Sequence, residues 1–230
     1  MARFFIEEIE QNKVQLSKMD SKHAIKVLRL KKGAEIELLN GKGTIAKGII
    51  TDENQKKTTV EIVKTVSFDP VSQICLAYSP TKSNDRNDWI IEKGTEIGVT
   101  HFCPIFTQNS ERRKCNLERM EKVTIAAIKQ CGNPWLPKIH QPQNFIDFIS
   151  NLDFSGLKFI AHCRDGQKIK LKKVVDATKN QLVLIGPEGD FTKQEIDNAI
   201  KNKFTPIDLG INTLRAETAC ISSLSLMKLS

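Results

Sequence analysis

The sequence has no long hydrophobic run and no leader-like start. Its apolar stretches, such as residues 182–185, are far shorter than the roughly 20 residues that a membrane-spanning helix needs. Acidic Glu7 and Glu8 stand where a signal peptide would carry its apolar core. We therefore expect a cytoplasmic protein without a membrane partner.

Cysteine and histidine are present, but they are not grouped. The six cysteines form no C-x-x-C pair, and the four histidines are dispersed along the chain. Structural zinc sites bring such residues together at short, regular spacings. The sequence therefore predicts no metal, and scattered cysteines of this kind are typical of reduced, mostly buried thiols.

Charge is the first positive signal. The 230 residues contain 35 Lys and Arg against 27 Asp and Glu, a formal net charge of +8. A basic excess favours an anionic partner, of which nucleic acid is the commonest. The segment Asn40-Gly-Lys-Gly-Thr44 does not complete a phosphate-binding P-loop, because Ile36 and Gly43 stand where that motif needs Gly and Ser or Thr. We interpret it as a hairpin turn.

Two parts of the chain differ in pattern. Residues 1–68 alternate short β-like runs with turn signals, which is typical of a small barrel. From residue 73 onward strands alternate with helices, which predicts a parallel sheet covered by helices. We expect domains at 1–68 and 73–230, joined by a linker at 67–72. The expected strands are 4–6, 13–16, 35–39, 44–50, 58–66, 74–78, 101–105, 157–162, 182–185 and 205–209, and the expected helices are 21–28, 84–97, 116–131, 192–201 and 214–229.

Two strand ends break at glycine. The apolar run at 182–185 enters Gly-Pro-Glu-Gly, and Thr192 with Glu195 then forms a capping box that starts a helix. The run at 204–209 ends at Gly210, before Leu-Arg-Ala-Glu-Thr and the last helix. Either loop alone could be a tight connection without a ligand. Together they indicate one cleft, because ligands of open α/β sheets bind outside the carboxyl ends of the strands.

The segments 185–192 and 209–219 closely resemble the signature of the SPOUT methyltransferases, and more narrowly that of the ribosomal RNA small subunit methyltransferase E family. The resemblance extends over most of the chain. Segments 23–33, 82–86, 92–99 and 110–112, with Pro104, fall in order where that family has its other motifs.

The resemblance implies an α/β SPOUT domain with a C-terminal trefoil knot, preceded by a small PUA-like β-barrel that binds RNA. It further implies methylation of uridine N3 in 16S rRNA with S-adenosyl-L-methionine, and a homodimer. Two rivals remain open: a SPOUT enzyme with another RNA or a ribose 2′-OH as target, and a non-catalytic RNA-binding assembly factor. The cofactor residues implied are His162, Leu184, Ile185, Gly186, Pro187, Glu188, Gly189, Leu209, Gly210, Ile211, Leu214 and Thr218. His162 could equally be a strand-end histidine with a local hydrogen bond.

Uracil N3 carries a proton, so the reaction needs a base or a cation that stabilises the anion. The resemblance implies Arg215, Arg112, Arg86 and Glu217 as catalytic residues. Glu217 could instead serve only the start of the last helix, since carboxylates are favourable there. Any one of the arginines could be solvated surface charge.

The resemblance also implies an RNA-binding set that comprises Lys26, Arg29, Lys31, Lys32, Lys82 and Arg113. The alternative for the four N-terminal residues is a basic edge that only keeps the barrel soluble. Around Asn133 the sequence departs from the family pattern, where many relatives carry a basic residue. This departure leaves substrate contacts of segment 130–137 open.

Overall fold

The computed structural model describes residues 1–9 and 12–229, which form two compact units. The first comprises Met1–Pro70 together with Ile125–Leu136, and the second comprises Val71–Thr124 and the chain from Pro137 onward. The expected linker brackets the division at residue 70. The sequence pattern did not indicate that residues 125–136 group with the first unit.

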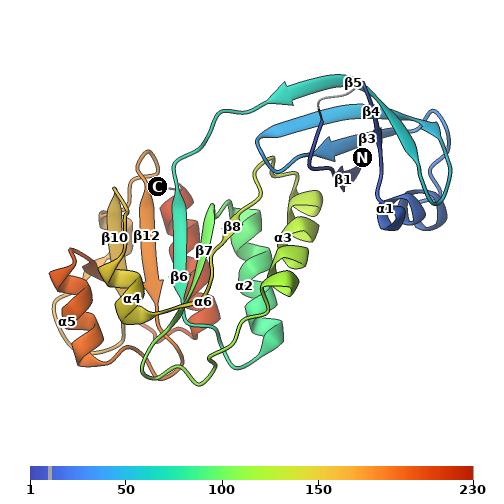
Figure 1. The fold of residues 1–230 in the computed structure, drawn as a ribbon. Helices are drawn as coiled ribbons and strands as arrows, with labels where there is room; N and C mark the ends of the chain where they lie inside the picture. The colour runs from blue at the N-terminus through green and yellow to red at the C-terminus, as the bar shows by residue number, and fades with distance from the viewer. Residues whose placement is uncertain (10–11, 230) are drawn as a thin grey trace. The chain divides into compact units, whose positions relative to one another are not determined.

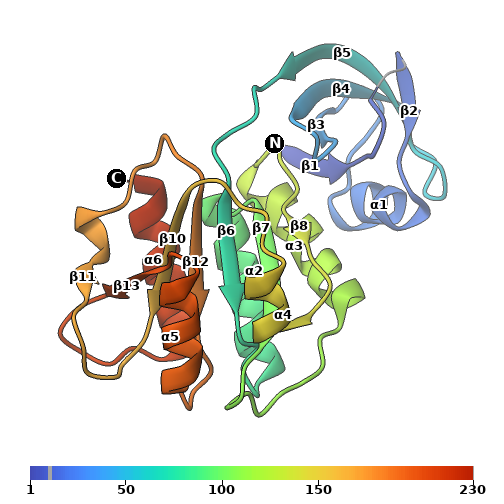
Figure 2. The same ribbon diagram turned by 60° about the vertical axis from the view of Figure 1, so that its left-hand side comes forward.

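The first unit is a five-stranded sheet that curls around its own core (Figure 2). Its order is β1-β3-β4-β5-β2, with β1 parallel to β3 and the other pairs antiparallel. The register shifts at Lys47/Gly48 and at Ile50/Asp52, and such bulges bend a strand. A Cβ on Gly48 would lie 2.5 Å from Val60 Cγ1. The strands are β1 (Ala2–Phe5), β2 (Lys13–Gln15), β3 (Glu35–Leu39), β4 (Thr44–Asp52) and β5 (Thr59–Ser67).

The single expected helix of this unit begins earlier than predicted and changes type. Ser17 accepts a hydrogen bond from the Asp20 amide and starts α1 (Lys18–Lys22), and a π-helical turn, η1 (His23–Val27), follows. The Leu28 amide reaches back five residues to the His23 carbonyl at 2.9 Å. The prediction of a regular helix at 21–28 is therefore wrong in its second half.

Residues 40–44 form the predicted hairpin turn between β3 and β4. Gly41 and Gly43 have φ of 68° and 91°, which favours glycine at both positions. The Leu136 amide donates to Gly41 O at 2.9 Å, and the Gly43 amide donates to Pro134 O at 3.0 Å. The segment that departs from the family pattern therefore packs on this turn.

The second unit is built on a sheet whose strand pairs are all parallel, as the alternating pattern predicted. The order is β11-β13-β10-β12-β6-β7-β8, with β9 also paired to β7. The strands are β6 (Ile74–Tyr78), β7 (His101–Phe106), β8 (Lys138–Ile139), β9 (Gln143–Asn144), β10 (Leu157–Ala161), β11 (Ile169–Lys170), β12 (Gln181–Ile185) and β13 (Thr205–Asp208).

Helices cover both faces of this sheet (Figure 1). One core joins the sheet to α2 (Asn84–Ile97), α6 (Ala216–Leu229) and Met120 in α3 (Leu117–Cys131). The other joins it to α4 (Phe145–Ser150) and α5 (Lys193–Lys201). A 3-10 turn, η2 (Leu171–Lys173), follows β11. The trefoil knot stays a prediction.

Candidate functional site

A cavity of about 630 Å³ opens at the carboxyl ends of three neighbouring parallel strands. Ala161, at the end of β10, is the register partner of both Ile185 in β12 and Ile207 in β13. All three residues line the cavity. Ligands of open α/β sheets bind at this edge, and small-molecule sites usually measure about 300–1,000 Å³.

The loop after β12 is held by Asp190, which adopts the left-handed conformation with φ of 59°. Its Oδ2 accepts from the Cys163 amide at 2.9 Å, and its Oδ1 accepts from the Phe191 amide at 2.7 Å. A Cβ on Gly186 would lie 3.1 Å from the Phe191 ring. These contacts fix the main chain of residues 186–188 as one wall of the cavity.

The second wall is the loop after β13. Asp208 Oδ1 accepts from the Gly210 amide at 3.0 Å. Gly210 has φ of 151° and no neighbour within 4 Å of an added Cβ, so conformation rather than space favours glycine here. Residues 209–215 line the cavity before α6 begins, and the side chain of Ile211 is fully exposed.

His162 follows β10 and lines the cavity between these two loops. Its Nδ1 is buried and has no hydrogen-bond partner among the described residues. Burial lowers the pKa of His162, and the nearby Lys168 ammonium lowers it further. The ring is therefore neutral at pH 7, with one buried nitrogen that has no partner among the described residues.

Arg86 and Glu217 form an ion pair beside the cavity. Arg86 lines the cavity from α2, and its Nε lies 3.4 Å from Glu217 Oε1 in the first turn of α6. The Glu217 side chain is 13% exposed, and its Oε2 is buried without a hydrogen-bond partner in the described part of the chain. Since a buried charge that loses its partner is costly, the two residues depend on each other.

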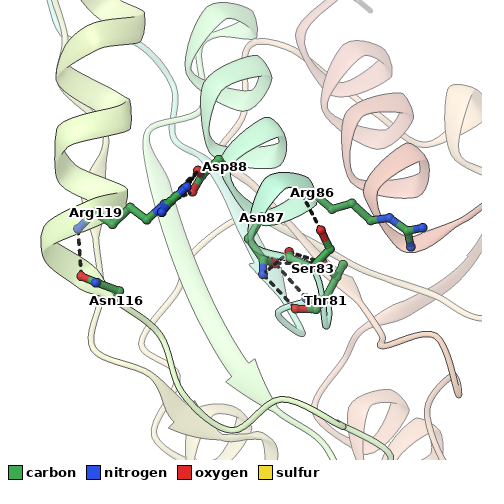
Figure 3. Close-up of polar contacts among 7 residues, drawn as sticks. All are labelled: Thr81, Ser83, Arg86, Asn87, Asp88, Asn116 and Arg119. Atoms are coloured by element: carbon green, nitrogen blue, oxygen red, sulfur yellow. Dashed lines mark hydrogen bonds and ion pairs between the residues drawn. The ribbon is translucent and has the colours of Figure 1, made fainter.

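The start of α2 is fixed by side-chain hydrogen bonds (Figure 3). Asn87 accepts from the Thr81 amide at 2.8 Å and donates to the Thr81 and Ser83 carbonyls, also at 2.8 Å. Asp88 receives Arg119 on both carboxylate oxygens. In Figure 3 the Arg86 side chain extends away from these contacts. The network therefore holds the backbone that carries Arg86.

Most of the residues predicted to bind the cofactor line the cavity, and so does Arg215. Leu184 does not, because neighbouring residues of a strand point to opposite faces, and Leu184 packs in the core beneath α4 and α5. A Cβ on Gly189 would point at Asn109 Cβ, 3.1 Å away, and Thr218 is exposed on α6 without lining the cavity. The predicted residues that line it are His162, Ile185, Gly186, Pro187, Glu188, Leu209, Gly210, Ile211 and Leu214.

The other predicted basic residues of this unit contact loops rather than the cavity. Arg112 donates to the Lys114 and Lys82 carbonyls at 3.0 and 3.2 Å, and Arg113 donates to the Thr107 carbonyl at 3.0 Å. The Lys82 ammonium lies 3.1 Å from a Glu111 oxygen. Arg112 thus braces two loops and is not among the residues that line the cavity, and its catalytic role stays a prediction.

Sequence reasoning missed several cavity residues, most of which stand beside a predicted one. Asp190 follows the Gly-Pro-Glu-Gly loop directly, and its position in that motif was the available signal. Lys168 had no comparable signal, because it reaches the cavity from the loop before β11 and donates to the His162 and Arg164 carbonyls. The missed lining residues are Ala161, Cys163, Lys168, Asp190, Ile207, Asp208, Asn212, Thr213, Ala216 and Ala219.

The predicted basic residues of the first unit are all exposed. Lys26, Arg29, Lys31 and Lys32 stand on or just after the π-helical turn. Arg29 has φ of 55°, an uncommon conformation for a residue other than glycine. Lys31 has one weak ion-pair partner, Glu53, at 3.8 Å. The basic side chains are thus presented to solvent.

Within the described residues, no group of three or more His, Cys, Asp and Glu side chains could hold a metal ion. All six cysteines are free thiols. No helix in the described part of the chain is long and apolar enough to cross a membrane.

Comparisons with known proteins agree with this geometry. A family model described as an RNA methyltransferase domain matches residues 68–228, and one described as an RNA methyltransferase PUA domain matches residues 5–63. Ribosomal RNA small subunit methyltransferase E of Aquifex aeolicus is 30% identical over 230 residues, which cover 97% of each chain.

Two solved structures are similar over nearly their whole length. A probable rRNA-methyltransferase from Porphyromonas gingivalis has a TM-score of 0.90 at 30% identity, with 97% of this chain and 95% of that chain covered. Ribosomal RNA small subunit methyltransferase E from Neisseria gonorrhoeae, solved with S-adenosyl methionine bound, has a TM-score of 0.90 at 26% identity, with 100% and 97% covered. The chain therefore belongs to the RNA methyltransferase family whose curated members are named ribosomal RNA small subunit methyltransferase E.

Proposed function

We propose that this enzyme transfers a methyl group from S-adenosyl-L-methionine to N3 of a uridine in 16S rRNA of the small ribosomal subunit. The observation that carries the proposal is the cavity at the ends of β10, β12 and β13, walled by the main chain of residues 185–188 and 209–214. The Neisseria gonorrhoeae relative was solved with this cofactor bound. A ribosomal substrate places the reaction in the cytoplasm.

The residues present fit such a cofactor. Main-chain groups of both glycine-containing loops line the cavity, and the buried, unpartnered Nδ1 of His162 can meet a polar edge of a ligand. Apolar Ile185, Leu209 and Leu214 offer a surface for a flat ring. S-adenosylmethionine supplies an activated methyl group on a sulfonium, so the protein has mainly to position the acceptor.

The acceptor nitrogen must lose its proton before it can attack. Arg86 and Arg215 are cavity-lining guanidinium groups, and each can stabilise the negative charge that develops on uracil as the N3 proton leaves. Glu217 acts through Arg86, whose Nε it holds at 3.4 Å. We therefore assign Arg86 and Arg215 to charge stabilisation and Glu217 to the positioning of Arg86.

RNA binding is assigned to exposed basic residues that contact phosphate and so position the substrate without reading its bases. In the first unit these are Lys26, Arg29, Lys31 and Lys32, beside exposed Val27 and Leu28. In the second unit they are Lys82 and Arg113.

We also propose a homodimer, as the family resemblance implies. Leu224 and Met227 of α6 are completely buried in the core of one chain, so they leave no side-chain surface for a partner. Trp89 on α2 and Leu229 on α6, 40% and 85% exposed, are apolar side chains that a partner could cover. Light scattering should give about twice the 25.9 kDa chain mass, and a fully active monomer would contradict the proposal.

The test of the proposed function is tritiated methyl transfer to small subunits that lack the modification, followed by nucleoside analysis. We expect radioactivity in 3-methyluridine, and Arg215→Ala should slow the single-turnover step while a Lys201→Ala control behaves as the wild type. Label in a 2′-O-methyl nucleoside would show another target. No label at all, from a protein that binds the cofactor, would indicate a non-catalytic factor.

A further inference from the structure

A second cavity, of about 310 Å³, lies near the amino ends of strands of the same parallel sheet. Gln73 precedes β6, His101 begins β7 and Leu182 is the second residue of β12, and all three line it. The proposed methyl-transfer site occupies the carboxyl ends of β10, β12 and β13 instead. The two cavities share no lining residue.

This second cavity exists because the edge of the sheet is interrupted. β8 pairs with the first half of β7 and β9 pairs with the second half. The His140 amide still donates to the Phe102 carbonyl of β7 at 2.9 Å, and the pairing is interrupted at residues 141–142. Pro104 stands in β7 beside this gap and has no N–H to donate to an edge strand. His140 and Gln141 stand at this interruption and line the cavity.

Two imidazole rings stand side by side in this cavity. The ring centroids of His101 and His140 are 5.3 Å apart, with planes inclined by 31°. Burial lowers the pKa of both rings, and Lys138 contributes to each shift, so both are neutral at pH 7. His140 Nε2 is buried and has no hydrogen-bond partner among the described residues. A buried nitrogen without a hydrogen bond is unfavourable, and a ligand with a matching polar edge would offset that cost.

Besides Asp153, two cysteines and a few apolar residues, the remaining lining combines carboxamides with aromatic rings. A carboxamide presents a donor and an acceptor together, and Asn or Gln can pair with both N6 and N7 of adenine. Phenylalanine and histidine rings stack on unpaired bases. A volume of about 310 Å³ is at the lower end of the usual range for ligand sites, which suits one base better than two. The residues concerned are Gln73, Gln141, Gln143, Asn151, Phe148 and Phe154.

We propose that this cavity is a second ligand site, which binds a single nucleobase, adenine best among the four. The inference does not depend on the proposed methyl transfer. The base could belong to a free nucleoside or to an unpaired nucleotide of RNA, since the chemistry of recognition is the same.

The chain has four histidines, so NMR can follow each imidazole ring separately and show which cavity a ligand enters. Imidazole proton resonances are followed by NMR while adenosine, guanosine, cytidine or uridine is added, with one equivalent of S-adenosylhomocysteine present to occupy the first cavity. We expect His101 and His140 to shift with adenosine, while His23 in the first unit and His162 in the first cavity stay unchanged. If a single-stranded oligoadenylate shifts the His101 and His140 signals at a lower concentration than adenosine does, the bound base belongs to RNA.

The matched variants are His140→Phe, which keeps a ring but removes the unpartnered nitrogen, and His23→Phe, which makes the same change elsewhere. His140→Phe should weaken adenosine binding at least tenfold, as read from His101, and His23→Phe should not change it. The proposal is overturned if no nucleoside shifts His101 and His140, or if His140→Phe binds adenosine as the wild type does. Tighter binding of uridine or cytidine would overturn the assignment of adenine.

Discussion

Arg86 and Glu217 show how one ion pair can connect the scaffold to the chemistry. Arg86 lines the first cavity, while Glu217 stands behind it with one carboxylate oxygen paired and the other buried. The sequence pattern grouped both residues as catalytic. The structure separates them, because only the arginine lines the cavity.

Glu217→Gln keeps the shape of the side chain but removes the charge that holds Arg86. We expect the methyl-transfer rate to fall about 10- to 100-fold, because Arg86 is then no longer held by an opposite charge, and a displacement of about 1 Å near the reacting atoms can cost about 100-fold. Cofactor affinity should change little. Single-turnover kinetics and calorimetry on the same preparations separate the two effects.

Arg86→Lys should lower the methyl-transfer rate by a similar factor. The double variant with Glu217→Gln should lower the rate by less than the product of the two single factors, because the residues act as one unit. Full additivity of the two effects would contradict the proposed pairing.

At the scale of secondary structure, the long helices and strands of the second unit follow from their patterns, whereas the six-residue helix α4 was not predicted. The capping box at Thr192 and Glu195 forms as predicted, and α2 ends at Ile97 where the sequence places Gly98, with φ of 101°. The strands of two residues, β8, β9 and β11, were missed, because so few residues carry no periodicity. The π-helical turn was missed because its composition is that of an ordinary helix.

Site residues were predictable where backbone geometry demands glycine and where the motif is contiguous. Lys168 could not be predicted, because it reaches the cavity through the spatial proximity of two loops. Leu184 packs in the core and does not line the cavity, and the motif alone does not say which residues of a strand face the ligand. That Arg86 lines the cavity while Arg112 contacts the Lys82 and Lys114 carbonyls likewise depends on side-chain directions that no sequence pattern records.

The packing of α2 gives a test at this scale. A Cβ on Gly94 would lie 2.9 Å from the Phe102 ring and 3.4 Å from Leu224 Cδ1. Alanine in a helix is otherwise favoured over glycine by about 0.5–1 kcal/mol. We expect Gly94→Ala to destabilise the protein by about 1–3 kcal/mol, because the buried ring must move.

Urea unfolding measures this difference, and Glu96→Ala, at an exposed position of the same helix, should change stability by less than about 0.5 kcal/mol. A stabilised Gly94→Ala variant would show that α2 packs less closely on β7 and α6 than the structure indicates.

For the whole molecule, histidine burial predicts how stability depends on pH. The folded state lowers the pKa of His101, His140 and His162 below the ordinary value of about 6.5. Below that pH the unfolded chain therefore binds more protons than the folded one, and the free energy of unfolding falls. The fall should level off once the pH is below the folded pKa values.

Urea unfolding between pH 7.5 and 5.5 should show this loss, starting at about pH 6.5, and His140→Phe should reduce it. A stability that is constant or rises as the pH falls through this window would contradict the burial of these rings.

The central claim is that the cofactor binds among the strand ends of the second unit. Calorimetry with S-adenosylhomocysteine tests it most directly, on the wild type and on two variants. Ala216→Trp fills the cavity from the first turn of α6. Ala126→Trp is the control, at an exposed position of α3 outside the lining. We predict one high-affinity site per chain in the wild type, at least 100-fold weaker binding at that site in Ala216→Trp, and unchanged binding by Ala126→Trp. Wild-type affinity in a folded Ala216→Trp protein would place the cofactor elsewhere.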